Sequence, residues 1–106
     1  MNIIDMQENA ERVSRLLKSL SNERRLMILC QLIEGEKSVG EIARSLEMRD
    51  AAASQQLSLL RKDNLVETRR DGQTIYYSVI RPDVRQLIEF LYLQFCETSE
   101  DQETSK

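Results

Sequence analysis

Histidine is absent from this 106-residue sequence, and cysteine is present only twice. Without histidine the chain lacks the commonest general base and the commonest transition-metal ligand. It cannot carry a Ser-His-Asp or Cys-His catalytic arrangement, and a zinc site would need the uncommon combination of two cysteines and carboxylates. These absences argue against an enzyme, and we expect neither a metal nor another cofactor.

Long apolar runs are also missing. No stretch approaches the roughly eighteen apolar residues that a transmembrane helix requires, and the N-terminus shows no secretion signal. We therefore expect a cytoplasmic protein with no membrane partner, in which two cysteines are not a structural disulfide framework. With only three glycines and one proline, the chain should be mostly regular structure with tight connections.

Charge is distributed unevenly. Four of the eighteen acidic residues and one of the fifteen basic residues fall within 97–106, so residues 1–96 are neutral overall. We expect 1–96 to form one folded domain and 97–106 an acidic, disordered tail. A nucleic-acid-binding surface usually carries a basic excess, so here it would have to arise from local clustering.

Apolar periodicity predicts four helices followed by a hairpin and a last helix. The helices are expected at about 5–19, 22–34, from Ser38 through Leu46, 51–63, and from Pro82 to about Cys96. Ser38 and Glu41 fit a capping box, Asp50 is expected to cap the helix over 51–63, and Asn64 suits a left-handed helix end. Residues alternate in polarity on either side of Asp71-Gly72, which is a hairpin signal.

This order of elements, α-α-α-α-β-β-α, is typical of one architecture. Two short helices joined by a tight turn and followed by a two-stranded ribbon describe a winged helix-turn-helix. The sequence thus predicts a mainly α fold with a β-hairpin wing.

Polar side chains suited to reading DNA gather on the helix over 51–63 and on the hairpin. Glutamine can hydrogen-bond adenine through two atoms, serine can serve base edges or phosphates, and the hairpin residues suit phosphates or a minor groove. The candidate contacts are Ser54, Gln55, Gln56, Ser58, Arg61 and Lys62 on the helix, and Arg69, Arg70, Gln73 and Thr74 on the hairpin. A solvated helix face and a hairpin that is basic only for solubility remain as the alternative interpretation.

Three segments, at 22–29 (NERRLMIL), 54–57 (SQQL) and 65–77 (LVETRRDGQTIYY), together resemble the ArsR/SmtB family of homodimeric bacterial repressors. The resemblance covers about 5–96. It implies a homodimer that binds double-stranded operator DNA and releases it when an inducer binds. It also implies that Ser54, Gln55 and Gln56 begin the base-reading part of the recognition helix and that 65–79 is the wing. Many members have histidine at Gln56, so the operator sequence stays open.

The metal sites that are usual in the family lack their ligands here. The region that matches the Cys-x-Cys site is 38–43, which has no thiol, and the site on the last helix has Asp83 but no histidine. Zinc, cadmium and nickel are therefore not expected as inducers.

Cys30 and Cys96 are then the candidate sensor residues. A lone cysteine is more often a small buried hydrophobe, which is the simpler interpretation of Cys30. Their placement, however, resembles the BigR/SqrR branch of the family, in which two cysteines of one subunit sense persulfides through a polysulfide bridge. The resemblance implies control of sulfide-detoxification genes, with a persulfide or related reactive sulfur species as inducer. Thiols too far apart for a direct disulfide can still be joined through additional sulfur atoms.

Other functions remain open for these residues. The same thiols suit a sensor of peroxide, electrophiles or a soft metal such as copper(I). A thiol-disulfide enzyme is disfavoured because there is no Cys-x-x-Cys motif. A winged-helix interaction module without DNA binding is supported only by the neutral charge of 1–96.

Overall fold

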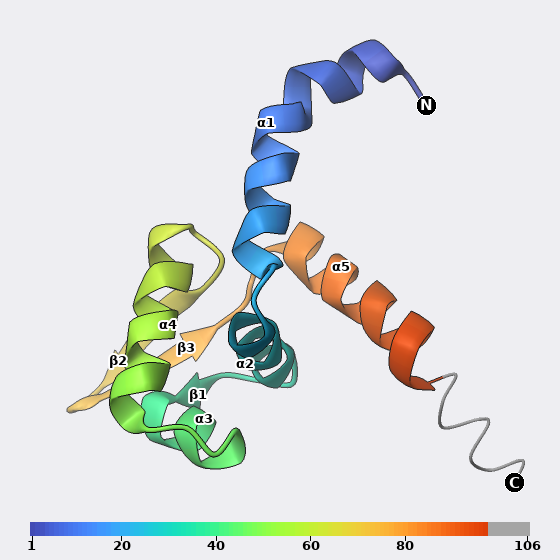
Figure 1. Ribbon diagram of the computed structural model, residues 1–106. Helices are drawn as coiled ribbons and strands as arrows, with labels where there is room; N and C mark the ends of the chain where they lie inside the picture. Colours follow the sequence, from blue (N-terminus) through green and yellow to red (C-terminus); the bar gives the residue numbers. More distant parts are fainter. Residues whose placement is uncertain (98–106) are drawn as a thin grey trace, which may run out of the picture.

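The computed structural model describes residues 1–97, and the expected tail beyond them lies outside the described residues. Within 1–97 the elements are α1 (Ile3–Leu20), α2 (Glu23–Ile33), β1 (Lys37–Ser38), α3 (Val39–Ser45), α4 (Asp50–Lys62), β2 (Glu67–Asp71), β3 (Thr74–Ser78), α5 (Pro82–Tyr92) and the π-helix η1 (Leu93–Glu97). The predicted order is confirmed (Figure 1), with the addition of one short strand, β1.

The helix starts follow local side-chain chemistry, with one exception. Asn22 caps α2, since its side chain accepts a hydrogen bond from the backbone of Arg25. The capping box of α3 is confirmed: Glu41 N donates to Ser38 Oγ (3.3 Å), and Ser38 N donates to Glu41 Oε1 (2.9 Å). The prediction that Asp50 caps α4 is wrong. Asp50 is the first helical residue, and the cap position before it makes no side-chain hydrogen bond.

Asn64 ends α4 as the sequence predicts. Its φ is 62°, the left-handed conformation that asparagine tolerates. Leu65 N donates to Leu60 O (2.9 Å) and Asn64 N to Arg61 O (3.0 Å), which is the Schellman pattern. Leu65 and Leu60 are both buried, so the turn that closes the helix is also anchored in the core.

The hairpin forms where expected, but its turn is shifted by one residue. Asp71 pairs with Thr74, so the two central residues are Gly72 and Gln73 and not Asp71 and Gly72. Gly72 has a φ of 64°, which glycine adopts without strain. The strand order is β1-β3-β2, all antiparallel, and β1 pairs through only two residues.

One core joins α2, α3, α4, the sheet and the start of α5. Its fully buried large side chains are Ile28, Leu29, Leu32, Ile42, Leu57, Leu60, Leu65 and Val84. Tyr77 of β3 is buried against this core, whereas Tyr76 next to it is only half-buried. The core therefore fixes α4 and the hairpin relative to each other.

Most of α1 and the end of the last helix lie outside this core. In α1 only Ser19 and Leu20 are buried, and the helix projects away from the body of the fold (Figure 1). The last helical segment reaches Glu97, one residue beyond the prediction, but its end is π-helical, so Cys96 lies in a widened turn. None of the helices described is both long and apolar enough to cross a bilayer.

Candidate DNA interface and dithiol site

The helix α4 has a buried side and an exposed side. Ala53, Leu57 and Leu60 face the core. Five of the six predicted DNA contacts on this helix are exposed, namely Ser54, Gln55, Ser58, Arg61 and Lys62. Gln56 is different: it is half-buried, and its Oε1 is buried without a hydrogen-bond partner among the described residues. The outward face of α4 is thus polar and accessible, and Gln56 lies on its inner flank.

A surface groove connects α4 with the hairpin. The groove has a volume of about 390 Å³ and is lined by Ser54 of α4 and by Gln73 and Thr74 of the hairpin, with Gly40 at the start of α3. Side chains predicted from two separate segments therefore line one groove. Because both segments are anchored in the same core, they present one continuous face.

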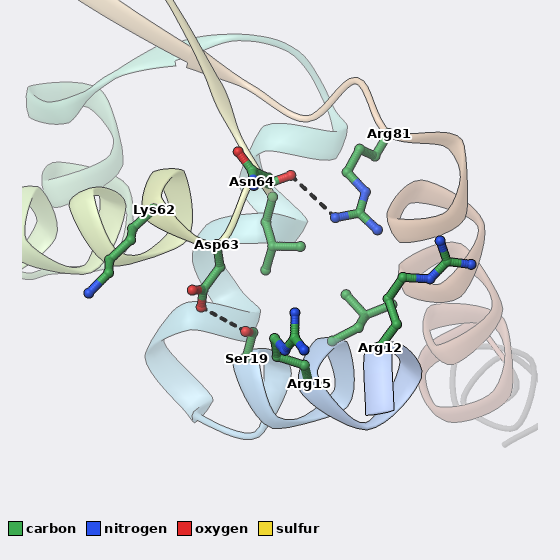
Figure 2. Close-up of a pocket in the computed structure, with 9 residues that line it drawn as sticks. Arg12, Arg15, Ser19, Lys62, Asp63, Asn64 and Arg81 are labelled. Carbon is green, nitrogen blue, oxygen red and sulfur yellow. Dashed lines mark hydrogen bonds between the residues drawn. The ribbon is translucent and has the colours of Figure 1, made fainter. Parts of the chain in front are cut away.

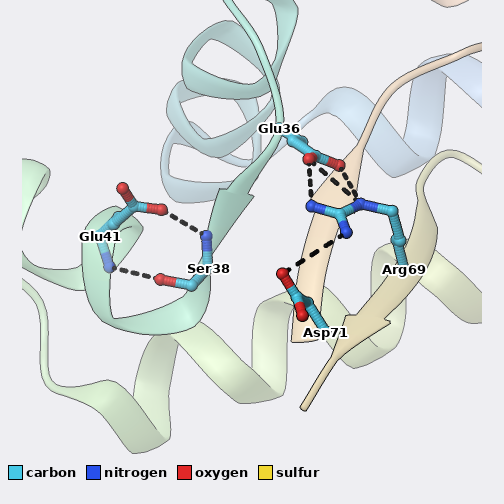
Figure 3. A network of polar contacts seen from close by, with 5 residues as sticks. All are labelled: Glu36, Ser38, Glu41, Arg69 and Asp71. Atoms are coloured by element: carbon cyan, nitrogen blue, oxygen red, sulfur yellow. Dashed lines mark hydrogen bonds and ion pairs between the residues drawn. The ribbon is translucent and has the colours of Figure 1, made fainter. Parts of the chain in front are cut away.

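The two hairpin arginines have different surroundings. Arg69 is bound to Glu36, with Nε to Oε2 at 3.1 Å and Nη2 to Oε1 at 2.5 Å (Figure 3). These hydrogen bonds hold the pKa of Glu36 below its usual value. Arg70 is exposed, and its side chain makes no hydrogen bond or ion pair with another residue of 1–97. Of the two, Arg70 is the one available to a phosphate.

Lys62 lies at the far end of α4, away from the groove of Ser54. It lines a separate pocket of about 310 Å³ between α1, the end of α4 and the start of α5 (Figure 2). Sequence reasoning missed this pocket, which gathers Arg12, Arg15 and Arg81 from segments far apart in the chain. Arg15 pairs with Glu11 and Arg81 with Asp83, so two of these cations are held by carboxylates outside the pocket.

The two cysteines belong to neighbouring helices. Cys30 is half-buried on α2, Cys96 is exposed on η1, and both are free thiols. Between α2 and α5 lies an open groove of about 480 Å³, called here the thiol groove. It is lined by Cys30, Ile33 and the capping residue Glu34 on one side and by Ile88, Glu89, Tyr92 and Leu93 on the other, and Cys96 lies outside this lining. The helices α2 and α5 therefore line one groove, and η1 continues α5 beyond it.

Electrostatics distinguish the two thiols. Burial raises the pKa of Cys30, and the nearby negative charges of Cys96 and Glu34 raise it further. Cys30 is therefore a protonated thiol near neutral pH, and a protonated thiol is a poor nucleophile.

Within residues 1–97 no three histidine, cysteine, aspartate or glutamate side chains gather in a group that could hold a metal ion.

Comparison with known proteins places this geometry in context. The family described as "Bacterial regulatory protein, arsR family" matches residues 22–68, which span α2 to the first strand of the hairpin. The transcriptional activator HlyU of Vibrio cholerae is 42% identical over 100 residues, covering 94% of this chain and 93% of the relative.

Solved structures agree with the sequence comparison. The transcriptional repressor BigR from Xylella fastidiosa superposes with a TM-score of 0.85 at 43% identity, covering 91% of this chain and 98% of that one. Reduced HlyU from Vibrio cholerae gives a TM-score of 0.82 at 43% identity, over 87% of this chain and 97% of that one. The homodimeric winged helix-turn-helix domain Mb0332 from Mycobacterium bovis gives 0.73 at 36% identity, over 83% and 82%. The proteins named here are regulators of transcription, and none is named as an enzyme.

Proposed function

Because this chain belongs to the ArsR family of bacterial regulatory proteins, we propose that it is a homodimeric transcriptional repressor that releases its operator when Cys30 and Cys96 react with a persulfide or a related reactive sulfur species. The observation that supports the proposal is the thiol groove, where Cys30 of α2 faces α5, while Cys96, 66 residues later in the chain, is exposed on η1, which directly continues α5. A regulator of this kind acts on DNA in the bacterial cytoplasm, and sulfide-detoxification genes are the proposed targets.

The DNA-binding part of the proposal rests on the exposed face of α4 and the adjoining hairpin. Ser54 and Gln55 lie on the N-terminal half of α4, the end that a recognition helix directs at base edges. Arg70, Gln73 and Thr74 extend the same side of the molecule as a wing. Arg61 is also exposed on α4, within reach of a DNA backbone. We leave Gln56 and Arg69 out of the direct contacts, since one is half-buried and the other is bound to Glu36.

Dimer formation is supported by the apolar face of α1. Ile3, Met6, Val13 and Leu17 recur at helical spacing and are exposed. Exposed apolar residues that form a stripe along one helix mark an interaction surface. The homodimeric relative from Mycobacterium bovis shares this fold, so a second copy of the chain is the proposed occupant.

The sulfur chemistry divides naturally between the two thiols. Cys96 is exposed and attacks first: its thiolate takes the outer sulfur of a persulfide, and the remainder leaves as a thiol. Cys30 then closes the bridge onto this Cys96 persulfide, forming a trisulfide. Closure releases two protons and two electrons, which a second persulfide accepts as it is cleaved to a thiol and hydrogen sulfide.

Closing the bridge would act on DNA binding through the dimer. The bridge ties α2, which packs against α4, to the end of the last helix. A shift of the last helix relative to α2 would change the separation of the two recognition helices, which must match half-sites about one DNA turn apart. A loss of about 3 kcal/mol, within the range of known couplings, would lower operator affinity over a hundredfold.

Intact-mass spectrometry after persulfide treatment tests the proposal. We expect each chain to gain whole sulfur atoms and to lose two hydrogen atoms, and the reducing agent dithiothreitol should reverse the change. A loss of two hydrogens without added sulfur would indicate a direct disulfide, and oxygen additions after persulfide would contradict sulfur transfer.

A further inference from the structure

An arginine side chain crosses the outer face of the three-stranded sheet. Arg69 of β2 pairs across the sheet with Tyr76 of β3, and Tyr76 in turn pairs with Ser38 of β1. The Arg69 guanidinium lies over the Tyr76 ring, 4.8 Å from its centre. It also reaches Glu36, which precedes β1, as Figure 3 shows. The pair of Arg69 and Glu36 thus crosses the central strand β3 and joins β2 to the residue before β1.

We call this arrangement of Glu36, Arg69 and Tyr76 the wing clamp. It strengthens the attachment of the hairpin to β1, which is otherwise held by a short pairing. The strand β1 pairs with β3 through only two residues, Lys37 with Tyr77 and Ser38 with Tyr76. The hairpin tip at Gly72-Gln73 extends beyond that pairing. A bidentate arginine–carboxylate pair fixes direction as well as distance, since its hydrogen bonds are parallel.

We propose that Glu36 and Arg69 are positioning residues, which set the angle at which the wing meets DNA, and that Arg69 does not itself contact phosphate. The proposal rests on the DNA binding described above and is independent of the cysteine chemistry. To reach a phosphate, Arg69 would have to give up three hydrogen bonds to Glu36 and its stacking on Tyr76.

Because the side chains of the wing clamp are exposed, it can be removed by mutation with little effect on the stability of the fold. The side chains of Arg69 and Glu36 are 53% and 40% exposed, and ion pairs in such positions contribute little to the free energy of unfolding. Breaking the clamp should therefore leave the fold intact while it releases the wing.

The two possible roles of Arg69 predict opposite effects of Glu36→Gln. If Arg69 were a phosphate contact, Glu36 would compete with DNA for it, and removing this negative charge would strengthen binding. If Arg69 positions the wing through Glu36, the same substitution weakens binding although it removes a charge that repels phosphate.

Operator affinity, measured by fluorescence anisotropy across a salt series, decides between them. The variants are Glu36→Gln, Arg69→Ala, both together, and Arg70→Ala, with Glu67→Gln on β2 as a matched control that removes another exposed carboxylate. Circular dichroism and thermal melting of each variant verify the fold.

We expect Glu36→Gln and Arg69→Ala each to weaken binding about threefold to tenfold, with the salt slope unchanged and the double variant no weaker than Arg69→Ala. Arg70→Ala should reduce the salt slope by about 1, and Glu67→Gln should bind as the wild type or more tightly. Tighter or unchanged binding by Glu36→Gln, or a slope reduction by Arg69→Ala, overturns the clamp. A wild-type protein without salt-dependent operator binding overturns both the clamp and the proposed function.

Discussion

The body of the fold, from α2 to the first turns of α5, and its flanks, which are α1 and the end of α5 with η1, bury their apolar residues to very different extents. In the body Ile28, Leu29 and Leu57 are fully buried, and the helix ends are capped by their own neighbours. On the flanks Ile3 and Phe90 are 64% and 56% exposed. The body is therefore complete within one chain, whereas the flanks present surface that a second copy would cover.

The thiol groove lies at the boundary between these regions. Cys30 is on α2, in the body, and Cys96 is at the end of the last helix, on a flank. A covalent bridge between them would restrain how the body sits on the dimerising helices. Under the proposed function, a reaction at these two sulfur atoms would act on α4, which contains neither of them, through this boundary.

A substitution on the exposed apolar face of α1 should have the largest effect on operator affinity. We expect Leu17→Glu to place charge in the proposed dimer interface, to give monomers, and to lower operator affinity more than a hundredfold, because separate monomers lose the benefit of binding two half-sites together. Sedimentation velocity and anisotropy measure the two effects. Lys18→Glu, a third of a helical turn away, is the control. A dimeric Leu17→Glu protein would place the interface elsewhere.

A substitution in the buried core of the body should instead lower the free energy of unfolding. Leu57→Ala removes a fully buried side chain and should lower the free energy of unfolding by about 2–5 kcal/mol. Ile3→Ala, on the exposed face of α1, should change it by about 0.5 kcal/mol or less at concentrations where the chain is monomeric. Urea titrations measure both. Similar losses for the two variants would show that α1 is packed within the chain.

Within the body, base contacts and phosphate contacts should separate. Gln55→Ala should weaken operator binding by about 1–3 kcal/mol and leave binding to random DNA unchanged, because it removes a base-edge contact. Arg70→Ala should weaken both complexes and reduce their salt dependence. Anisotropy on operator and random duplexes distinguishes them. If both variants reduce operator and random binding equally, the assignment of roles is wrong.

The smallest effect concerns the reactivity of Cys30. The negative charge of Glu34 contributes to its raised pKa, so Glu34→Gln should lower that pKa and increase the thiolate fraction at pH 8. We expect iodoacetamide to alkylate Cys30 about twofold faster in this variant, measured by peptide mass spectrometry. Glu23→Gln, at the start of the same helix, is the control. A slower reaction would contradict the sign of the electrostatic effect.

Signals that act over a few residues allowed the fold to be predicted. The capping box at Ser38 and the left-handed Asn64 are decided within one helical turn, and both are confirmed. The strand β1 was missed because two residues become a strand only by pairing with β3, about forty positions later. Asp50 was assigned as a cap because its residue type favours that position, but the helix begins one residue earlier.

The site was predicted less completely, because its contacts are between distant segments. The polar face of α4 was read from helical periodicity. Arg69 binds Glu36, which is 33 residues away in the chain. This contact forms only because the sheet brings β2 close to the start of β1. The half-burial of Gln56 and the gathering of Arg12 and Arg81 at one pocket likewise follow from packing between helices, which residue type and periodicity do not determine.

Operator affinity of single-cysteine variants, with and without persulfide, tests the central claim most directly. Serine is nearly isosteric with cysteine, so Cys30→Ser and Cys96→Ser should dimerise and bind the operator as the reduced wild type does. Persulfide should lower wild-type affinity over a hundredfold and leave both variants unchanged, since one thiol cannot close a bridge. If either variant still releases DNA with wild-type sensitivity, the two-cysteine switch is wrong.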